Sequence, residues 1–165
     1  MNTRKELRLK DYDYSQNGVY FITICTSDRK PLLSRISVGE GLAPPKIELL
    51  SLGEIAEKQL LNLESRYSVL TIDKYAVMPN HIHILMRLYN SGGASPSPTV
   101  SDIVGSYKSL TTRECKKIVK LEKLFQRSFY DHIIRREQDY LDVWQYIDNN
   151  PARWLDDELY VSENP

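Results

Sequence analysis

The sequence predicts an α+β fold built on an antiparallel sheet. A strand pattern comes first, a helical pattern follows it, two strand patterns joined by a tight turn come next, and further helical patterns fill the C-terminal part. Strands joined by a short turn pair antiparallel, and amphipathic helices bury their apolar sides against such a sheet. No internal repeat or linker interrupts this order, so we expect a single domain over residues 1–165.

The first predicted strand covers residues 19–26, because VYFITICT is rich in β-branched and aromatic residues and follows a Gln-Asn-Gly turn. Residues 31–38 and 46–50 are candidates for short extended segments around the loop GEGLAPP, which indicates a surface hairpin. A first helix is expected over residues 51–65. It starts with the capping-box pattern Ser-x-x-Glu and continues with apolar residues at helical spacing.

Residues 69–77 and 81–88 are predicted to form two strands joined at Met-Pro-Asn, since proline and asparagine suit a tight turn. The segment SGGASPSP at 91–98 is a predicted loop because small residues and prolines favour irregular backbone. These two strands supply the central hairpin of the expected sheet.

Two helices are predicted in the C-terminal part. The first runs from residue 99 to about 120, and the pattern of residues 121–136 does not decide between helix and strand. The second runs from residue 138 or 139 to 149. It ends there because Pro151 disfavours helical geometry in the residue before it.

Composition and the N-terminal segment predict a cytoplasmic protein with no membrane partner. Hydrophobic residues make up 41% and charged residues 27%, within the ordinary range of globular proteins. No apolar stretch approaches the roughly 18 residues of a membrane span, and the N-terminal MNTRKELRLKDYDY lacks the apolar core of a signal peptide. Cys25 and Cys115 form no Cys-x-x-Cys, so we expect them to be small packing residues.

The formal net charge is zero, but the charges are segregated along the chain. Residues 103–136 contain nine basic and three acidic residues, whereas residues 137–165 contain eight acidic residues and one arginine. A local basic surface can neutralise phosphates even on a neutral protein. The basic segment therefore fits either a nucleic-acid contact or an ordinary solvated helix face.

Two histidines stand two residues apart near the start of the predicted 81–88 strand. Side chains of a strand alternate between its faces, so His81 and His83 share one face while alternate residues from Ile82 to Leu88 line the other. Two neutral imidazoles side by side supply half of a metal site. Without further ligands, the same pair would be two hydrogen-bonded histidines of a half-buried strand.

The last predicted helix contains Tyr146 and Asn150, four positions apart and therefore on one helix face. That face would present a phenol, a possible nucleophile, together with an amide oxygen, a possible metal ligand. The chain has eleven tyrosines, so abundance does not select Tyr146. Tyr130 and Tyr140 are its nearest rivals, and we expect both to pack in the core.

The His-hydrophobic-His strand and the tyrosine with an amide four residues later resemble the single-tyrosine HUH transposases, of the insertion-sequence 200-like superfamily. Within that group the chain is most similar to the REP-associated tyrosine transposases. Four blocks carry the likeness in the family's order: YDYSQNGVYFITICTSDRK, YAVMPNHIHILM, YKSLTTR and FQRSFYDHIIR. The resemblance spans about residues 12–153.

The resemblance implies a ferredoxin-like fold: an antiparallel sheet with helices packed on one face and a C-terminal helix that carries the tyrosine. It implies that Tyr146 attacks a phosphate of single-stranded DNA at a hairpin-flanked site and forms a 5′-phosphotyrosine bond. His81 and His83 would hold Mg²⁺ or Mn²⁺, with Asn150 as the third ligand by resemblance. Asn149 stays open as an alternative third ligand, and no general base is apparent.

The expected partner is single-stranded or hairpin DNA. Candidate phosphate contacts are Lys108, Arg113, Arg127 and Arg135. The protein is expected to be a monomer or a homodimer, and the sequence leaves this choice open. His132, on an isoleucine-rich segment, is expected to be an ordinary histidine rather than a metal ligand.

Two other functions remain possible at this point. The first is a regulator that binds hairpin DNA on the same scaffold without cleaving it, which predicts missing catalytic residues. The second is a metal-dependent phosphodiesterase that activates water at the histidine pair. It predicts additional carboxylate ligands, for which Asp73 and Asp131 are weak candidates. A covalent adduct with DNA would separate the strand-transferase hypothesis from both.

Overall fold

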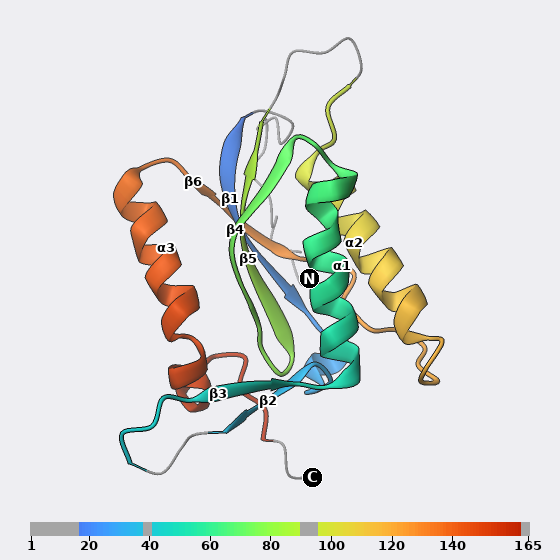
Figure 1. Ribbon diagram of the computed structural model, residues 1–165, viewed down its shortest axis with the longest axis vertical. Coiled ribbons are helices and arrows are strands. Elements are labelled where there is room, and N and C mark those ends of the chain that lie inside the picture. The colour runs from blue at the N-terminus through green and yellow to red at the C-terminus, as the bar shows by residue number, and fades with distance from the viewer. Residues whose placement is uncertain (1–16, 38–40, 90–95, 163–165) are drawn as a thin grey trace, which may run out of the picture.

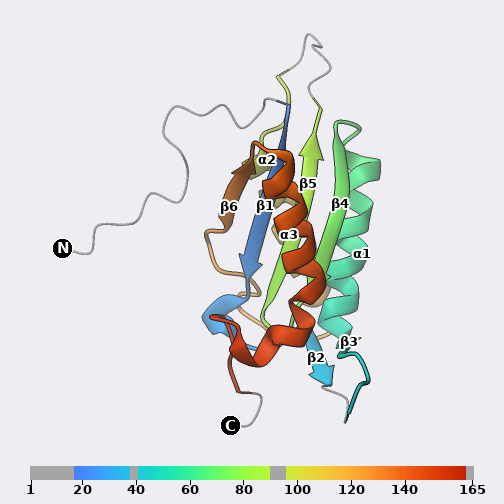
Figure 2. The same cartoon turned by 90° about the vertical axis from the view of Figure 1, so that its left-hand side faces the viewer.

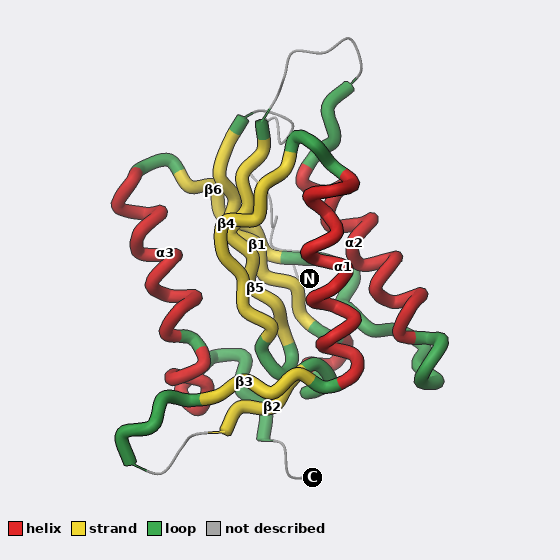
Figure 3. The backbone as a smooth tube through the Cα atoms, viewed as in Figure 1, coloured by secondary structure: helices red, strands yellow, loops and turns green. Residues whose placement is uncertain are grey.

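A four-stranded sheet forms the centre of the fold, and its strands are among those drawn in yellow in Figure 3. Every neighbouring pair of these strands is antiparallel. The computed structural model describes residues 17–37, 41–89 and 96–162. The strand order is β4-β5-β1-β6, and a separate two-stranded ribbon pairs β2 with β3. The elements are β1 (Gly18–Cys25), η1 (Ser27–Arg29), β2 (Ser34–Ser37), β3 (Lys46–Leu49), α1 (Ser51–Arg66), β4 (Leu70–Val77), β5 (His81–Leu88), α2 (Val100–Cys115), β6 (Tyr130–Ile134), α3 (Glu137–Asn149) and η2 (Pro151–Asp156).

The chain order of these elements is ferredoxin-like. Two strand-helix-strand units, β1-α1-β4 and β5-α2-β6, each place their first strand at the centre of the sheet. The β2-β3 ribbon is inserted between β1 and α1, where the sequence predicted a hairpin. The predicted α+β class with an antiparallel sheet is confirmed.

Helices cover both faces of the sheet (Figures 1 and 2). On one face, α1 and α2 lie side by side, and Leu60 and Tyr107 join Ile84 of the sheet in the larger apolar core. On the opposite face, α3 and η2 bury Ile147 and Trp154 in a second core. The prediction that helices pack on one face of the sheet therefore holds for α1 and α2, whereas α3, the helix that carries Tyr146, covers the opposite face.

Strand β5 contributes to both cores by alternation. Ile82 and Ile84 belong to the core beneath α1 and α2, whereas Leu85 belongs to the core beneath α3. His81 and His83 share the face of Leu85, as the strand pattern predicted. The exposed fraction is 0% for His81 and 3% for His83, so the pair faces the protein interior. The alternation that defines the histidine face is confirmed.

One helix cap and one helix end differ from the sequence prediction, whereas α1 starts at Ser51 as predicted. The capping box expected at Ser51 does not form, because the Leu50 N–H donates to Leu33 O and the helix takes Leu50 as its N-cap with no side-chain bond. The second helix ends at Cys115 rather than near residue 120. Beyond it Ile118 and Val119 are exposed, so continued helix would bury no apolar face. A capping box does form at the start of α2, where Thr99 and Asp102 bond reciprocally.

The segment that the pattern left undecided contains β6, which pairs with the N-terminal half of β1. Cys25 and Cys115 are buried free thiols, as expected. Within the described ranges, each helix is too short or too polar to cross a membrane. The N-terminal segment 1–16 and most of the predicted 91–98 loop lie outside the described residues.

Candidate metal and nucleophile site

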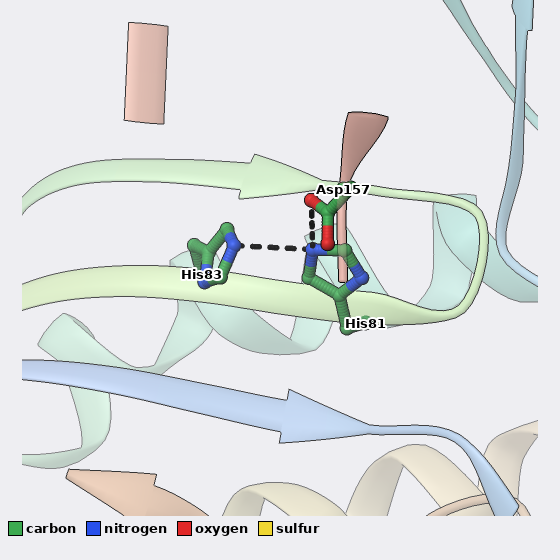
Figure 4. Close-up of side chains that lie close together, drawn as sticks. All are labelled: His81, His83 and Asp157. Atoms are coloured by element: carbon green, nitrogen blue, oxygen red, sulfur yellow. Dashed lines mark hydrogen bonds and ion pairs between the residues drawn. The ribbon is translucent and has the colours of Figure 1, made fainter. Parts of the chain in front are cut away.

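The two imidazoles of β5 meet edge to face under α3 (Figure 4). Their Nε2 atoms lie 3.1 Å apart. Strand geometry explains the meeting, because residues two apart on a strand stand side by side on one face. The sequence therefore places two nitrogen donors at one point of the sheet.

Hydrogen bonds at the other ring nitrogens orient both histidines. His81 Nδ1 lies 2.8 Å from Asn80 Oδ1, and His83 Nδ1 lies 2.9 Å from the Thr23 hydroxyl of the paired strand β1. Asn80 Oδ1 can only accept a hydrogen bond, so His81 carries its proton on Nδ1 and presents a lone pair on Nε2. The Thr23 hydroxyl can accept from His83 in the same way. Both Nε2 atoms can then act as ligands.

Burial keeps the imidazoles neutral. It lowers the pKa of His81 to about 4, although Asp157 and Asn150 oppose the shift. Burial and the neighbouring His81 also hold the pKa of His83 well below its ordinary value of 6.5. Since a metal ion binds the neutral form, both histidines are ready ligands at neutral pH.

A carboxylate that sequence reasoning missed completes the cluster. Asp157, directly after η2, reaches back so that its Oδ2 lies 3.9 Å from His81 Nε2. The potential ligand atoms of His81, His83 and Asp157 all lie within 4.8 Å of one another, the arrangement in Figure 4. Nothing in the sequence separates Asp157 from the acidic residues beside it, because its position depends on how the chain turns after α3.

Tyr146 lies over the histidine pair from α3. Its ring contacts His83 edge to face, with 5.4 Å between ring centroids, and contacts Phe21 of β1 at 5.9 Å. The residue is 46% exposed and lines an open cavity. Burial raises the pKa of this phenol above its ordinary value of 10.0, and Asp157 and Glu158 raise it further against an opposing bond from Asn150.

Asn150 connects the phenol with the histidines. Its Nδ2 donates to Asp157 Oδ2 over 3.1 Å, and the side chain shifts the pKa values of both Tyr146 and His81. Its Oδ1 is buried and accepts no hydrogen bond of regular geometry from the described residues. Asn149, the alternative ligand of the sequence prediction, is exposed at the end of α3. The fold thus buries Asn150 beside the histidine pair, whereas Asn149 is exposed and lines the same cavity as Tyr146.

These donors fit a divalent metal ion. Two imidazole nitrogens bound to one ion at about 2.1 Å each lie roughly 3 Å apart when they take neighbouring coordination positions. The observed Nε2 separation of 3.1 Å meets that condition. The Oδ1 atom of Asn150 lies at the same place and can act as an additional metal ligand. A buried oxygen without a hydrogen-bond partner is unfavourable, and a bound cation would satisfy it. The residues present therefore suit a metal site.

Comparisons with known proteins identify the family of this chain. The family model described as "Transposase IS200 like" matches residues 52–150, more than half of the chain. The chain belongs to the IS200-like transposase family. An uncharacterized protein of Haemophilus influenzae is 31% identical over 96% of this chain and 93% of its own length. A second protein of that organism, provisionally named a REP-associated tyrosine transposase, is 24% identical over 86% of this chain and 74% of its own length.

Solved structures of transposases share the fold. A REP-associated tyrosine transposase bound to a REP hairpin superposes with a TM-score of 0.64 and 20% identity, covering 88% of this chain and 73% of that chain. A Deinococcus radiodurans protein provisionally described as a transposase gives a TM-score of 0.51 and 19% identity, covering 86% of this chain and 95% of that chain. The resemblance to REP-associated tyrosine transposases inferred from the sequence is confirmed.

In this IS200-like transposase, the tyrosine opens onto a cavity of about 1040 Å³ that also reaches His83. Its charged lining consists of Arg29, Asp142, Arg153, Asp156, Asp157 and Glu158, so acidic groups outnumber arginines. Tyr130 lines the same cavity from β6 and is 48% exposed. The expectation that Tyr130 packs in the core was wrong, because its strand partner Thr23 places it on the histidine face. Tyr140 is half-buried, and its hydroxyl donates to Asp73.

The candidate phosphate contacts lie away from this cavity. Lys108, Arg113 and Arg127 line a second cavity of about 690 Å³ beside α2, on the other side of the sheet. The Lys108 ammonium donates to the carbonyl oxygens of Gln126 and Arg127, at 2.6 and 2.9 Å. Arg135, directly after β6, lines neither of these two cavities. The structure therefore groups three of the four predicted basic residues and separates Arg135 from them.

The carboxylates expected of a phosphodiesterase lie elsewhere. Asp73 accepts from Arg87 and Tyr140, and Asp131 of β6 pairs in register with the core residue Ile22. Within the described ranges, the single cluster of histidine and carboxylate side chains that could hold a metal ion contains Asp157 instead. His132 is exposed on β6 and does not belong to that cluster.

Proposed function

We propose that this protein is a metal-dependent single-stranded DNA endonuclease and strand transferase that acts at hairpin-flanked sites, with Tyr146 as the nucleophile. One observation carries the proposal: an accessible phenol lies edge to face on His83 in an open cavity. Membership of the IS200-like transposase family supports it. We also propose that residues 1–165 form a single domain.

His81, His83 and Asn150 would hold Mg²⁺ or Mn²⁺. The ion would supply positive charge that stabilises the developing charge on the phosphate oxygens. Such help is needed here, because acidic groups dominate the cavity lining and would otherwise repel the DNA backbone. The orphaned Oδ1 of Asn150 favours it over the exposed Asn149 as the third ligand.

The Tyr146 hydroxyl oxygen attacks the scissile phosphorus and forms a phosphotyrosine bond to the 5′-phosphate of the downstream DNA fragment. The bond from phosphorus to the 3′-oxygen breaks, and that oxygen takes up a proton to leave as a 3′-hydroxyl. The raised pKa keeps the phenol protonated at neutral pH, so its proton leaves as the oxygen attacks, into the open cavity that Tyr146 lines. Attack of a 3′-hydroxyl on the phosphotyrosine reverses these changes and joins strands without ATP.

Hairpin DNA with a single-stranded flank is the proposed substrate, because the solved REP-associated tyrosine transposase similar to this chain is bound to a REP hairpin. Arg113 and Arg127, in the cavity beside α2, are proposed phosphate contacts, together with Arg135. Lys108 would act there by holding the loop that carries Arg127, since its ammonium is bonded to that loop.

The proposed active site lies within one chain, because Tyr146 contacts the His83 of its own chain. We therefore propose cleavage by a single protomer, whether the protein is a monomer or a homodimer. Mixing His83→Ala with Tyr146→Phe tests this point. Recovery of cleavage in the mixture would mean that two chains share the site.

The central test is trapping of a covalent protein–DNA adduct. Wild-type protein with a 5′-extended hairpin oligonucleotide and Mn²⁺ or Mg²⁺ should give an adduct that resists denaturation and maps to the peptide containing Tyr146. Tyr146→Phe removes only the hydroxyl and should abolish the adduct while hairpin binding persists. Tyr130→Phe is the matched control, because Tyr130 lines the same cavity with similar exposure. Tight hairpin binding without any wild-type adduct would instead favour a non-cleaving regulator.

A further inference from the structure

We propose that Asp157 is a direct ligand of the divalent ion held by the histidine pair, so that the segment after η2 completes the metal site. The inference rests on the proposed function, because it concerns the same ion. It goes beyond the proposed His81, His83 and Asn150 set by adding a charged donor from outside the tyrosine helix.

The two oxygens of Asp157 have different surroundings. Oδ1 accepts the backbone N–H of Leu159 over 2.7 Å, which fixes the carboxylate plane. Oδ2 points to the site, 3.1 Å from Asn150 Nδ2 and 3.9 Å from His81 Nε2. Only 6% of the side chain is exposed, so water does not solvate Oδ2 freely. Oδ1 is therefore engaged by the backbone, whereas Oδ2 accepts from the Asn150 amide and keeps a lone pair that can face an ion.

The charge of this buried carboxylate needs a partner. Across the described ranges, no lysine or arginine nitrogen lies within 4.0 Å of Asp157, and the group in that range is His81. His81 directs its ring proton to Asn80 Oδ1 through Nδ1, so the Nε2 atom that faces Asp157 presents a lone pair rather than a positive charge. A buried anion without a cation is costly, and the attraction of an ion placed between carboxylate and imidazoles would offset that cost.

Asn80 ties Asp157's segment to the histidine pair. Its Oδ1 accepts from His81 Nδ1, and its Nδ2 donates to Leu159 O over 2.6 Å and to Arg29 O over 3.2 Å. Trp154 adds ring contacts with both His81 and Tyr160. The residue that orients one imidazole thus also holds the chain two residues after Asp157, so the donors are arranged before an ion arrives.

The Asp157 carboxylate also changes which metal ions the site prefers. Histidines and an amide form a neutral ligand set, whereas adding Asp157 gives the set a charge of about −1 and a second oxygen donor. Oxygen donors and negative charge favour hard cations such as Mg²⁺ and Mn²⁺. Four protein donors are fewer than the six that these ions take, so the set leaves room for a phosphate oxygen or water.

The test measures metal binding by the full chain without DNA. We would titrate metal-free protein with Mn²⁺, following free Mn²⁺ by electron paramagnetic resonance, and record Co²⁺ absorption spectra of the same samples. Asp157→Asn keeps the shape of the side chain and should weaken Mn²⁺ binding by about tenfold or more. It should also change the Co²⁺ ligand-field bands. Asp156→Asn is the matched control, because Asp156 is an exposed neighbour with the same charge.

Each outcome decides the inference. Unchanged Mn²⁺ affinity for Asp157→Asn would overturn it, and so would weaker binding with an unchanged Co²⁺ spectrum, which would make Asp157 a positioning residue. Thermal unfolding checks that the variants fold, and Asp157→Ser replaces the asparagine variant if that one does not. His83→Ala tests the metal site separately. Retained Mn²⁺ binding by His83→Ala would reject the proposed metal site itself. Loss of Mn²⁺ binding by His83→Ala, together with normal Mn²⁺ binding by Asp157→Asn, would reject only the role of Asp157.

Discussion

Replacing Gly53 by alanine tests how α1 supports the metal site. Gly53 lies in the first turn of α1, where a Cβ would overlap the Leu33 carbonyl and approach its carbon to 2.8 Å. The Leu33 N–H donates to Pro79 O, in the turn that precedes His81. A shift of Leu33 would therefore reach both the α1 packing and the start of β5.

The expected magnitude follows from two opposing terms. Carbon atoms pack at about 3.5–4.0 Å, so the helix or Leu33 must move by about 1 Å, and such overpacking costs about 1–3 kcal/mol. Alanine in a helix gains about 0.5–1 kcal/mol over glycine. Because the obstacle is backbone rather than a flexible side chain, we expect the upper part of the cost to apply. The net loss should be about 2 kcal/mol, or about 4–8 °C in Tm for a chain of this size.

Gly105→Ala provides the matched control. Gly105 is an exposed residue inside α2, and a Cβ there would meet nothing within 4 Å. The same substitution should therefore raise the Tm by about 1–4 °C through the propensity gain alone. Calorimetry or urea unfolding measures both variants, and Mn²⁺ titration shows whether the histidine site is disturbed in Gly53→Ala. A Tm of Gly53→Ala at or above that of wild type would refute the reasoning.

Three further outcomes are expected. Thr23→Val removes the hydroxyl at His83 Nδ1 and should weaken Mn²⁺ binding by about 10–100-fold in a titration; equal affinity would show that Thr23 does not orient the ligand. Hydrogen bonds with Thr99 lower the pKa of Asp102. The ionised carboxylate therefore stabilises α2 at pH values above its ordinary pKa of 3.8, and this stabilisation is lost as the pH falls through the lowered pKa. Asp102→Asn should reduce stability at pH 7 and flatten its acid decline, as urea unfolding at several pH values can show. Arg127→Gln should lower hairpin affinity and reduce the slope of log Kd against log salt by about one, whereas an unchanged slope would place Arg127 off the DNA.

The sequence by itself determined the features that depend on local periodicity. A period of two puts His81 and His83 on one face of β5, and a spacing of four brings Asn150, the C-cap of α3, next to Tyr146. The order of strands and helices was likewise enough for the α+β class, since short turns leave few ways to pair the strands. Each of these features is decided by residues that are neighbours in the chain.

Only the tertiary structure decided what surrounds the histidines. Thr23 meets His83 through the register of β1 with β5, and Asp157 meets His81 through the turn of the chain after α3. The exposure of Tyr130 also follows from its pairing with β1. These contacts join residues many positions apart, so they depend on sheet register and on the packing of α3 and η2 over the sheet. Neither the sheet register nor this packing can be inferred from a local stretch of sequence, because both depend on the simultaneous burial of the two cores.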